Sequence, residues 1–172
     1  MSLILITGLA GTGKSTIRAE LVSRGYAAYD QDEDHLAKWY NDATGKAVIG
    51  RPKRTTEFLR THSRDVKRTT LQGLATKAEN ELVFLCGDPE NDTELRDLFS
   101  HAFALKLDEV ARQHRLATRT NNQYGKTPED LAYDAENLRQ SAGIYKELKY
   151  TLVDANRPTA EIVDDILAQV ES

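Results

Sequence analysis

The chain has few features of secreted, membrane or nucleic-acid-coating proteins. Its 172 residues include a single cysteine, Cys86, so no disulfide can form within the chain. No run of apolar residues approaches the roughly 20 that a membrane-spanning helix needs. Basic residues are outnumbered, with 23 Lys and Arg against 27 Asp and Glu and a net charge of −4. These absences argue against a disulfide-rich scaffold, an integral membrane protein and an overall basic nucleic-acid-binding surface.

The chain also shows no internal repeat, low-complexity tract or linker. With 40% hydrophobic and 29% charged residues, its length favours one globular domain, residues 1–172, with a substantial core. The first two residues lead directly into an apolar stretch with no basic region before it, so we predict no signal peptide. We therefore expect a cytoplasmic protein with no membrane partner, and a single cysteine fits a reducing compartment.

One stretch near the start matches the phosphate-binding loop (P-loop) pattern G-x-x-x-x-G-K-[ST] at every fixed position. It reads Gly8-Leu9-Ala10-Gly11-Thr12-Gly13-Lys14-Ser15. The apolar segment 3–7 before it is typical of a buried strand, and apolar residues at helical spacing follow it. Strand, glycine-rich turn and helix start is the context in which the pattern binds phosphate. A glycine turn that matches the pattern by chance is the alternative.

The residue types in this loop suit polyphosphate chemistry. Glycines allow backbone conformations that let successive N–H groups surround phosphate oxygens, and the helix start adds the positive end of its dipole. We expect Lys14 to reach the β- and γ-phosphates of ATP and the Ser15 hydroxyl to ligate Mg²⁺. The expected nucleotide-contacting residues of the loop are Gly8, Leu9, Ala10, Gly11, Thr12, Gly13, Lys14, Ser15 and Thr16.

Strand-like and helix-like segments alternate along the chain. The expected strands cover residues 3–7, 26–29, 81–86, 102–107 and 150–154. The expected helices begin near 14 and then cover 36–40, 57–80, 93–100, 108–118, 128–148 and 159–170. This alternation predicts an α/β, three-layer P-loop NTPase fold with a five-stranded parallel sheet. Residues 36–80 are expected to form a helical, acceptor-binding insertion, and residues 108–130 a lid.

Three carboxylates follow expected strands, where open α/β sheets place ligands. Asp30 and Asp32 have D-x-D spacing, and on extended backbone they point the same way. We expect Asp30 to orient Mg²⁺ and Asp32 to accept a proton from a substrate hydroxyl, unless both belong to a solvated acidic helix start. Asp88 is a further Mg²⁺ candidate, with a turn aspartate before proline as its alternative.

Two groups of arginines are candidates for binding anions. Arg112, Arg115 and Arg119 share one helical face that leads into the expected lid. Arg115 and Arg119 would neutralise the transferring phosphoryl group, or would simply form a solvated basic face. Arg60 and Arg64, in a second basic stretch, either hold an anionic acceptor or are exposed.

Together these features resemble the small-molecule branch of P-loop kinases, namely shikimate kinase, gluconate kinase and adenylate kinase. Shikimate kinase has a similar layout, with the P-loop after strand one, D-x-D after strand two and lid arginines after strand four. An arginine upstream of a tyrosine on the next helix is matched by Arg139 and Tyr145. The resemblance implies that Arg157 lies against adenine, that Arg139 binds the acceptor and that Asp32 contacts the hydroxyl being phosphorylated.

The chain departs from these families where they hold their substrates. Shikimate kinase has G-G-G after strand three, where this chain has Cys86-Gly87-Asp88, and the D-G-F-P-R of adenylate kinase is absent. The expected lid sequence, residues 119–126, matches neither family. The resemblance therefore implies the fold and the use of ATP, but not the acceptor.

We therefore expect a Mg²⁺- and ATP-dependent kinase whose acceptor is a small hydroxylated metabolite or a nucleotide. One alternative is an NTPase or nucleotide-binding switch without an acceptor. Another is a polynucleotide-end kinase that uses the basic stretch 51–68, although the acidic net charge argues against a nucleic-acid partner. The oligomeric state is not predicted.

Overall fold

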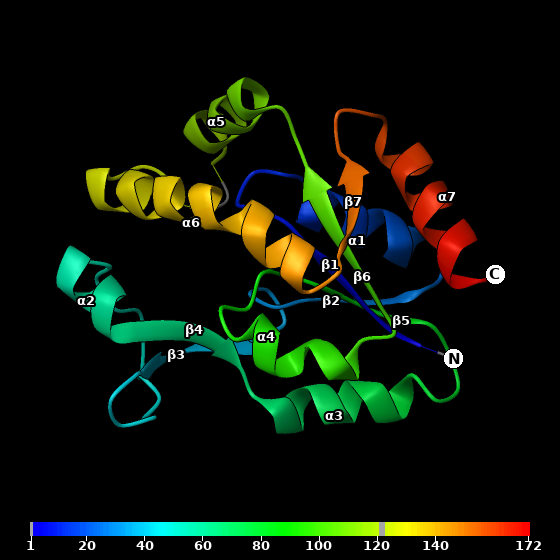
Figure 1. Cartoon of the computed structure of the whole chain (residues 1–172), viewed down its shortest axis with the longest axis horizontal. Helices are drawn as coiled ribbons and strands as arrows, with labels where there is room; N and C mark the ends of the chain where they lie inside the picture. The colour runs from blue at the N-terminus through cyan, green and yellow to red at the C-terminus, as the bar shows by residue number, and fades with distance from the viewer. Residues whose placement is uncertain (1, 121–122) are drawn as a thin grey trace.

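A five-stranded parallel sheet forms the centre of the molecule, for which a computed structural model describes residues 2–120 and 123–172 (Figure 1). The strand order is β2-β5-β1-β6-β7, and every neighbouring pair is parallel. The strands are β1 (Leu3–Thr7), β2 (Ala27–Asp30), β5 (Val83–Cys86), β6 (His101–Lys106) and β7 (Thr151–Asp154). All five residues of β1 are buried, as expected for the middle strand of a sheet covered on both faces.

Helices cover both faces of this sheet and complete three layers. Alternate strand residues point to opposite faces, so Ile4 and Ile6 pack with α1 and α7, while Leu3 and Leu5 pack with α3 and α4. The helices are α1 (Lys14–Ser23), α2 (Thr56–Thr61), α3 (Arg68–Lys77), α4 (Asp92–Leu95) with the 3₁₀ turn η1 (Arg96–Leu98), α5 (Glu109–Thr118), α6 (Pro128–Glu147) and α7 (Thr159–Val170). The predicted fold class is confirmed.

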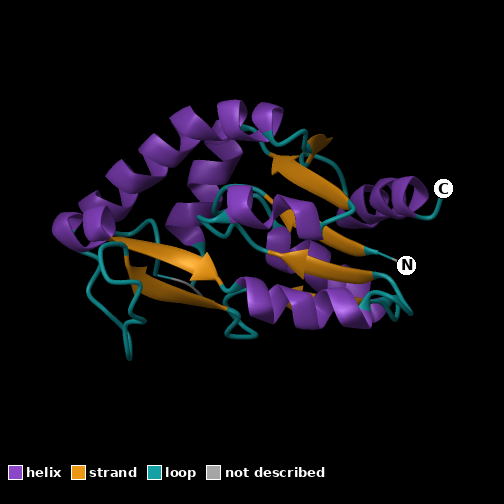
Figure 2. Cartoon of the chain, turned by 60° about the horizontal axis from the view of Figure 1, so that its bottom comes forward, coloured by secondary structure: helices purple, strands orange, loops and turns teal. Residues whose placement is uncertain are grey.

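The insertion differs from the helical segment that the sequence predicts. An antiparallel ribbon of β3 (Ala37–Asn41) and β4 (His62–Val66) extends beside the main sheet (Figure 2). The prediction of a helix over 36–40 is therefore wrong, and the predicted helix 57–80 is interrupted by β4. Phe58 stacks on His62 at 4.1 Å and packs edge-on against Trp39 at 5.2 Å. These contacts and the backbone pairing between two distant segments outweigh the helical spacing of the apolar residues.

The segment after β6 contains α5 and α6, and their bounds lie within one residue of the predicted helices 108–118 and 128–148. The Asp108 side chain accepts a hydrogen bond from Ala111 N at 3.1 Å, and the Thr127 side chain accepts one from Asp130 N at 3.1 Å, so both residues cap their helices. Residues 121–122 of the expected lid lie outside the described residues. In place of the predicted helix 93–100, the structure has the short helix α4 followed by the 3₁₀ turn η1, which ends at Leu98. None of the described helices is both long and apolar enough to cross a membrane.

Candidate active site

The P-loop connects the carboxyl end of β1 to the start of α1. Gly8, Gly11 and Gly13 have φ of 146°, 87° and 105°, values that side chains disfavour. A Cβ atom at Gly8 would also lie 2.9 Å from the Leu105 carbonyl oxygen. Among the described residues, no protein acceptor takes a hydrogen bond from the amides of Gly11, Gly13, Lys14 or Ser15. These four N–H groups can therefore bind an anion.

Lys14 lies over its own loop and beside a carboxylate. Its Nζ donates to the carbonyl oxygens of Gly8 and Leu9, the latter at 3.2 Å. The same atom is 3.8 Å from Asp88 Oδ2, so strand ends β1 and β5 bring the two predicted residues together. The lysine charge is thus held over the P-loop.

Ser15 and Asp30, both predicted as Mg²⁺ ligands, are in contact. Ser15 Oγ donates to Asp30 Oδ2 at 3.4 Å. The other Asp30 oxygen accepts the amides of Asp32 at 2.8 Å and Glu33 at 3.0 Å, which holds the turn after β2. Hydroxyl and carboxylate oxygens are the hard donors that Mg²⁺ prefers, so this pair fits that ion. In the described part of the chain, no three His, Cys, Asp or Glu side chains gather as a metal site.

Asp88 is held on its other oxygen by Gln31, the middle residue of D-x-D. Gln31 Nε2 donates to Asp88 Oδ1 at 3.1 Å. Burial raises the pKa of Asp88 and the Lys14 charge opposes that rise, although 46% of the Asp88 side chain is accessible. The carboxylate of Asp88 is therefore accessible to a ligand beside Lys14. Gln31 has no role predicted from the sequence, where its position between two candidate carboxylates is its only signal.

Asp32 and Arg64, both predicted to contact the acceptor, lie against each other. Arg64 Nε donates to Asp32 Oδ1 at 3.0 Å, and Arg64 Nη2 donates to the same oxygen. The guanidinium carbon of Arg64 is 5.8 Å from the centre of the Trp39 ring. The β3–β4 ribbon thus brings a cation and an aromatic face to the turn after β2.

The two arginines of α5 and Arg119, which directly follows it, have different environments. Arg115 is exposed, and its Nη1 would be 3.7 Å from a Cβ atom built on Gly13, which places it at the P-loop. Arg119 donates from Nη2 to the Tyr124 carbonyl at 2.9 Å, and burial lowers its pKa. Arg112 is only 1% exposed and forms hydrogen bonds to Ala10, Glu109 and Asp134, so it is not part of a solvated basic face. Nothing in the sequence indicated its partner Asp134.

Comparison with known proteins gives the family and the fold. Residues 4–141 match the model of a family described as the AAA domain. This chain belongs to the AAA domain family. A search of curated proteins finds no match to it.

Solved kinase structures share the fold of this AAA-domain protein. A shikimate kinase from Acinetobacter baumannii, in complex with shikimate, is 16% identical, with a TM-score of 0.61 over 99% of this chain and 93% of that chain. A gluconokinase from Sinorhizobium meliloti is 21% identical, with a TM-score of 0.54 over 98% and 90%. A deoxyadenosine kinase from M. mycoides with bound dATP is 13% identical, with a TM-score of 0.56 over 99% and 100%. The predicted resemblance to small-molecule P-loop kinases is confirmed for the fold.

For three other candidate residues of this AAA-domain protein, the contacts found in the described part of the chain are with residues outside the P-loop. Arg139 is 74% exposed and pairs with Glu136 on its own helix. Arg157 pairs with Asp165 at 2.7 Å, near the start of α7. Arg60 is exposed and lines a cavity of about 200 Å³ between α2 and α6. Their expected roles toward acceptor and adenine stay predictions.

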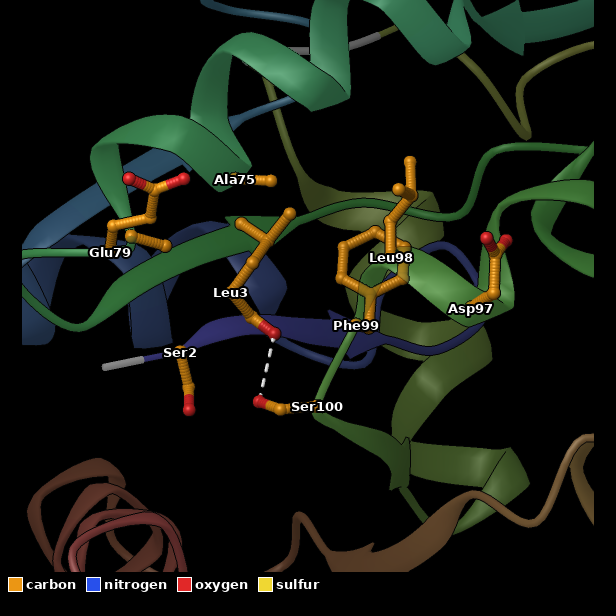
Figure 3. Close-up of a pocket in the computed structure, with 9 residues that line it drawn as sticks. Ser2, Leu3, Ala75, Glu79, Asp97, Leu98, Phe99 and Ser100 are labelled. Carbon is orange, nitrogen blue, oxygen red and sulfur yellow. Dashed lines mark hydrogen bonds between the residues drawn. The ribbon is translucent and has the colours of Figure 1, made fainter.

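A second cavity, of about 300 Å³, is lined by residues at the amino end of β1 and by neighbouring segments (Figure 3). It is bounded by the start of β1, the end of α3 and the segment after η1, where Ser100 Oγ donates to Leu3 O at 3.2 Å. The carboxyl ends of the strands, which hold the P-loop and the aspartates, point away from it. This cavity is therefore separate from the candidate active site.

Proposed function

We propose that this AAA-domain protein is a phosphotransferase that moves the γ-phosphoryl group of ATP, bound with Mg²⁺, to a hydroxyl of a small acceptor. One observation carries the proposal. A P-loop with unpaired amides lies at the same sheet edge as the Asp32–Arg64 pair, which belongs to neither the loop nor α1. A nucleotide-binding switch needs only the loop. A transferase also needs a group that accepts the proton of the acceptor hydroxyl, and a surface that binds the acceptor.

The donor side is built from the P-loop and its neighbours. The free amides and Lys14 would bind the phosphate oxygens, and Arg115 lies where it can reach them from α5. Ser15 and Asp30 would hold Mg²⁺, with Asp88 beside Lys14 as a further oxygen donor. The ion, when bound, neutralises charge on the β- and γ-phosphate oxygens. These side chains therefore orient the γ-phosphate and screen its charge before transfer.

The acceptor side is the surface around Asp32. Its Oδ1 is occupied by Arg64, while its Oδ2 has no hydrogen bond among the described residues and can accept a proton from an acceptor hydroxyl. The solved relatives act, by name, on shikimate, gluconate and deoxyadenosine. All of these carry hydroxyl groups on small polar frameworks, so we place the acceptor of this chain in that chemical class.

The test is phosphoryl transfer from labelled ATP to a panel of sugars, sugar acids, cyclic hydroxy acids, nucleosides and nucleotides. The expected result is a labelled product with at least one acceptor class, together with ADP. Free phosphate as the only labelled product, with every acceptor, would instead indicate an NTPase. A parallel reaction with DNA and RNA oligonucleotides separates a polynucleotide kinase from both, because its binding would weaken steeply with salt.

A further inference from the structure

Arg112 lies where three segments meet beside the P-loop. Its side chain is 1% exposed, and its guanidinium donates to acceptors on α5, on α6 and on the loop itself. The distances are 2.8 and 2.7 Å to the Glu109 carboxylate, 2.9 and 2.7 Å to the Asp134 carboxylate and 2.9 Å to the Ala10 carbonyl. Burial alone would lower the pKa of Arg112, but these carboxylates raise it, so the group stays charged. All five N–H donors of Arg112 therefore form hydrogen bonds, and its charged group is held in one position.

The contact with Ala10 has a geometric consequence for the next amide. In a planar trans peptide, the carbonyl of one residue and the N–H of the following residue point in opposite directions. Because Arg112 Nη1 holds the Ala10 carbonyl, it turns the Gly11 N–H away from α5. That N–H has no protein acceptor among the described residues. Gly11 has a left-handed φ of 87° and no side chain to restrict its backbone. A contact from elsewhere in the protein is therefore needed to fix the orientation of the Ala10–Gly11 peptide.

We propose that Arg112 is a positioning residue of the phosphate site, which orients the Gly11 N–H toward the polyphosphate of a nucleotide by holding the Ala10 carbonyl. Asp134 and Glu109 hold Arg112 in turn. The inference rests on the proposed function only in that the P-loop binds a nucleotide. It assigns Arg112 no contact with the phosphates and no part in the transfer itself.

The stability of the folded protein alone is a weak reason for burying the charged pair Arg112–Asp134. Replacing a buried ion pair by well-packed apolar side chains is often neutral or stabilising, because desolvation offsets the attraction. A charged arginine is needed, however, if one guanidinium must bind two carboxylates and still donate to a loop carbonyl. The five donors of Arg112 make five hydrogen bonds to these groups, whereas a Lys ammonium has only three donors.

The experiment compares Arg112→Met and Arg112→Lys with a matched control, Arg96→Met. Arg96 also donates to two carbonyls, of Leu148 at 2.9 Å and Phe99 at 2.8 Å, but it lies at η1, near the opposite end of the sheet. Calorimetry with Mg²⁺ measures the affinity for ADP, and circular dichroism measures the melting temperature. A protein labelled with ¹⁵N-glycine has only ten glycine amides, so the resonance of Gly11 can be followed on adding ADP.

We expect Arg112→Met to weaken ADP binding roughly tenfold or more, as for other residues that orient direct ligands, and to reduce the ADP-induced shift of the Gly11 amide. Arg112→Lys is expected to lie between Arg112→Met and wild type. Arg96→Met should lower the melting temperature while leaving ADP affinity unchanged. Wild-type affinity in Arg112→Met, or affinity losses that follow melting temperature in both methionine variants, would overturn the proposal.

If Arg112→Met does not fold, Asp134→Asn decides instead. This variant retains an oxygen acceptor for Arg112 but removes the buried charge, so ADP affinity should fall and the Gly11 amide should shift in the free protein. Unchanged affinity and an unchanged Gly11 resonance would overturn the inference. The proposed function fails differently, since wild-type protein would then bind ADP without transferring phosphate to any acceptor, or would bind no nucleotide at all.

Discussion

Arg64 Nε donates to Asp32 Oδ1 across 3.0 Å, so an arginine of β4 holds a carboxylate of the turn that follows β2. Both side chains are partly exposed, at 28% and 51%, and the Trp39 ring lies 5.8 Å from the Arg64 guanidinium carbon. Only one carboxylate oxygen of Asp32 is used. Under the proposed function this pair binds the hydroxyl-bearing acceptor, so its removal should affect the acceptor more than the nucleotide.

We predict that Arg64→Met lowers kcat/KM for the acceptor by about 10- to 100-fold, because a charge-assisted hydrogen bond contributes roughly 1.5–3 kcal/mol. The KM for ATP should change little. The control is Arg68→Met, whose arginine pairs with Asp97 on the exposed surface near α3. Steady-state kinetics with each substrate varied in turn measure both effects. Equal losses in the two variants would contradict a specific role for Arg64.

We predict that Lys14→Ala abolishes turnover while the protein stays folded. Among the described residues, Lys14 donates to two carbonyls of its own loop and lies 3.8 Å from the partly exposed Asp88, so little packing is lost. Phosphoryl transfer measures the activity and circular dichroism measures the fold. Lys77→Ala is the control, because Lys77 donates to Tyr29 on the α3 side of the sheet. Retained turnover in Lys14→Ala would refute the assigned phosphate site.

We predict that Gly87→Ala destabilises the protein by about 1–3 kcal/mol, since a Cβ atom there would lie 2.6 Å from Gln31 Cδ and would also clash with Gln31 Oε1. Gln31 is 3% exposed and anchored on Asp88, so it has little room to move. Gly73→Ala is the matched control. A Cβ atom at Gly73, on helix α3, would have no neighbour within 4 Å, so this variant should be more stable than wild type by roughly 0.5–1 kcal/mol. Urea unfolding of both variants measures the difference, and equal stabilities would contradict the contact.

We predict that Glu109 contributes to stability above the ordinary pKa of Glu, about 4.3, and that this contribution is lost below it. The hydrogen bond from Arg112 lowers the pKa of Glu109 in the folded protein, so the unfolded chain binds more protons as pH falls. With 41% of the side chain exposed, the effect should be about 1 kcal/mol or less. Urea midpoints at neutral pH and near pH 3 should therefore differ less in Glu109→Gln than in wild type. Identical pH dependence would show that the pair does not contribute.

The correct predictions rest on signals that are local in the chain. The P-loop pattern, the buried strand before it and the helix after it are adjacent, so their backbone geometry follows from nearby residues. The starts of α5 and α6 are similarly local, because Asp108 and Thr127 each accept from an amide three residues ahead. The placement of Asp30 and Lys14 at one sheet edge follows from the parallel arrangement, since all strands end on the same side.

The errors and omissions involve partners far apart in the chain. Residues 62–66 read as helix because their spacing is compatible with one, but their backbone groups pair with 37–41 instead. Arg112 reads as a surface arginine until α6 brings Asp134 to it, and Gln31 is unremarkable until β5 places Asp88 beside it.

The amino-acid sequence by itself determined the loop that is built for phosphate, the α/β architecture and the class of kinases that shares this fold. Only the tertiary structure decided which charged side chains face the site and which are paired elsewhere, as with Arg64 and Arg139. The physical reason is that backbone conformation depends mainly on neighbouring residues, whereas the partner of a charged side chain depends on which distant segment packs against it.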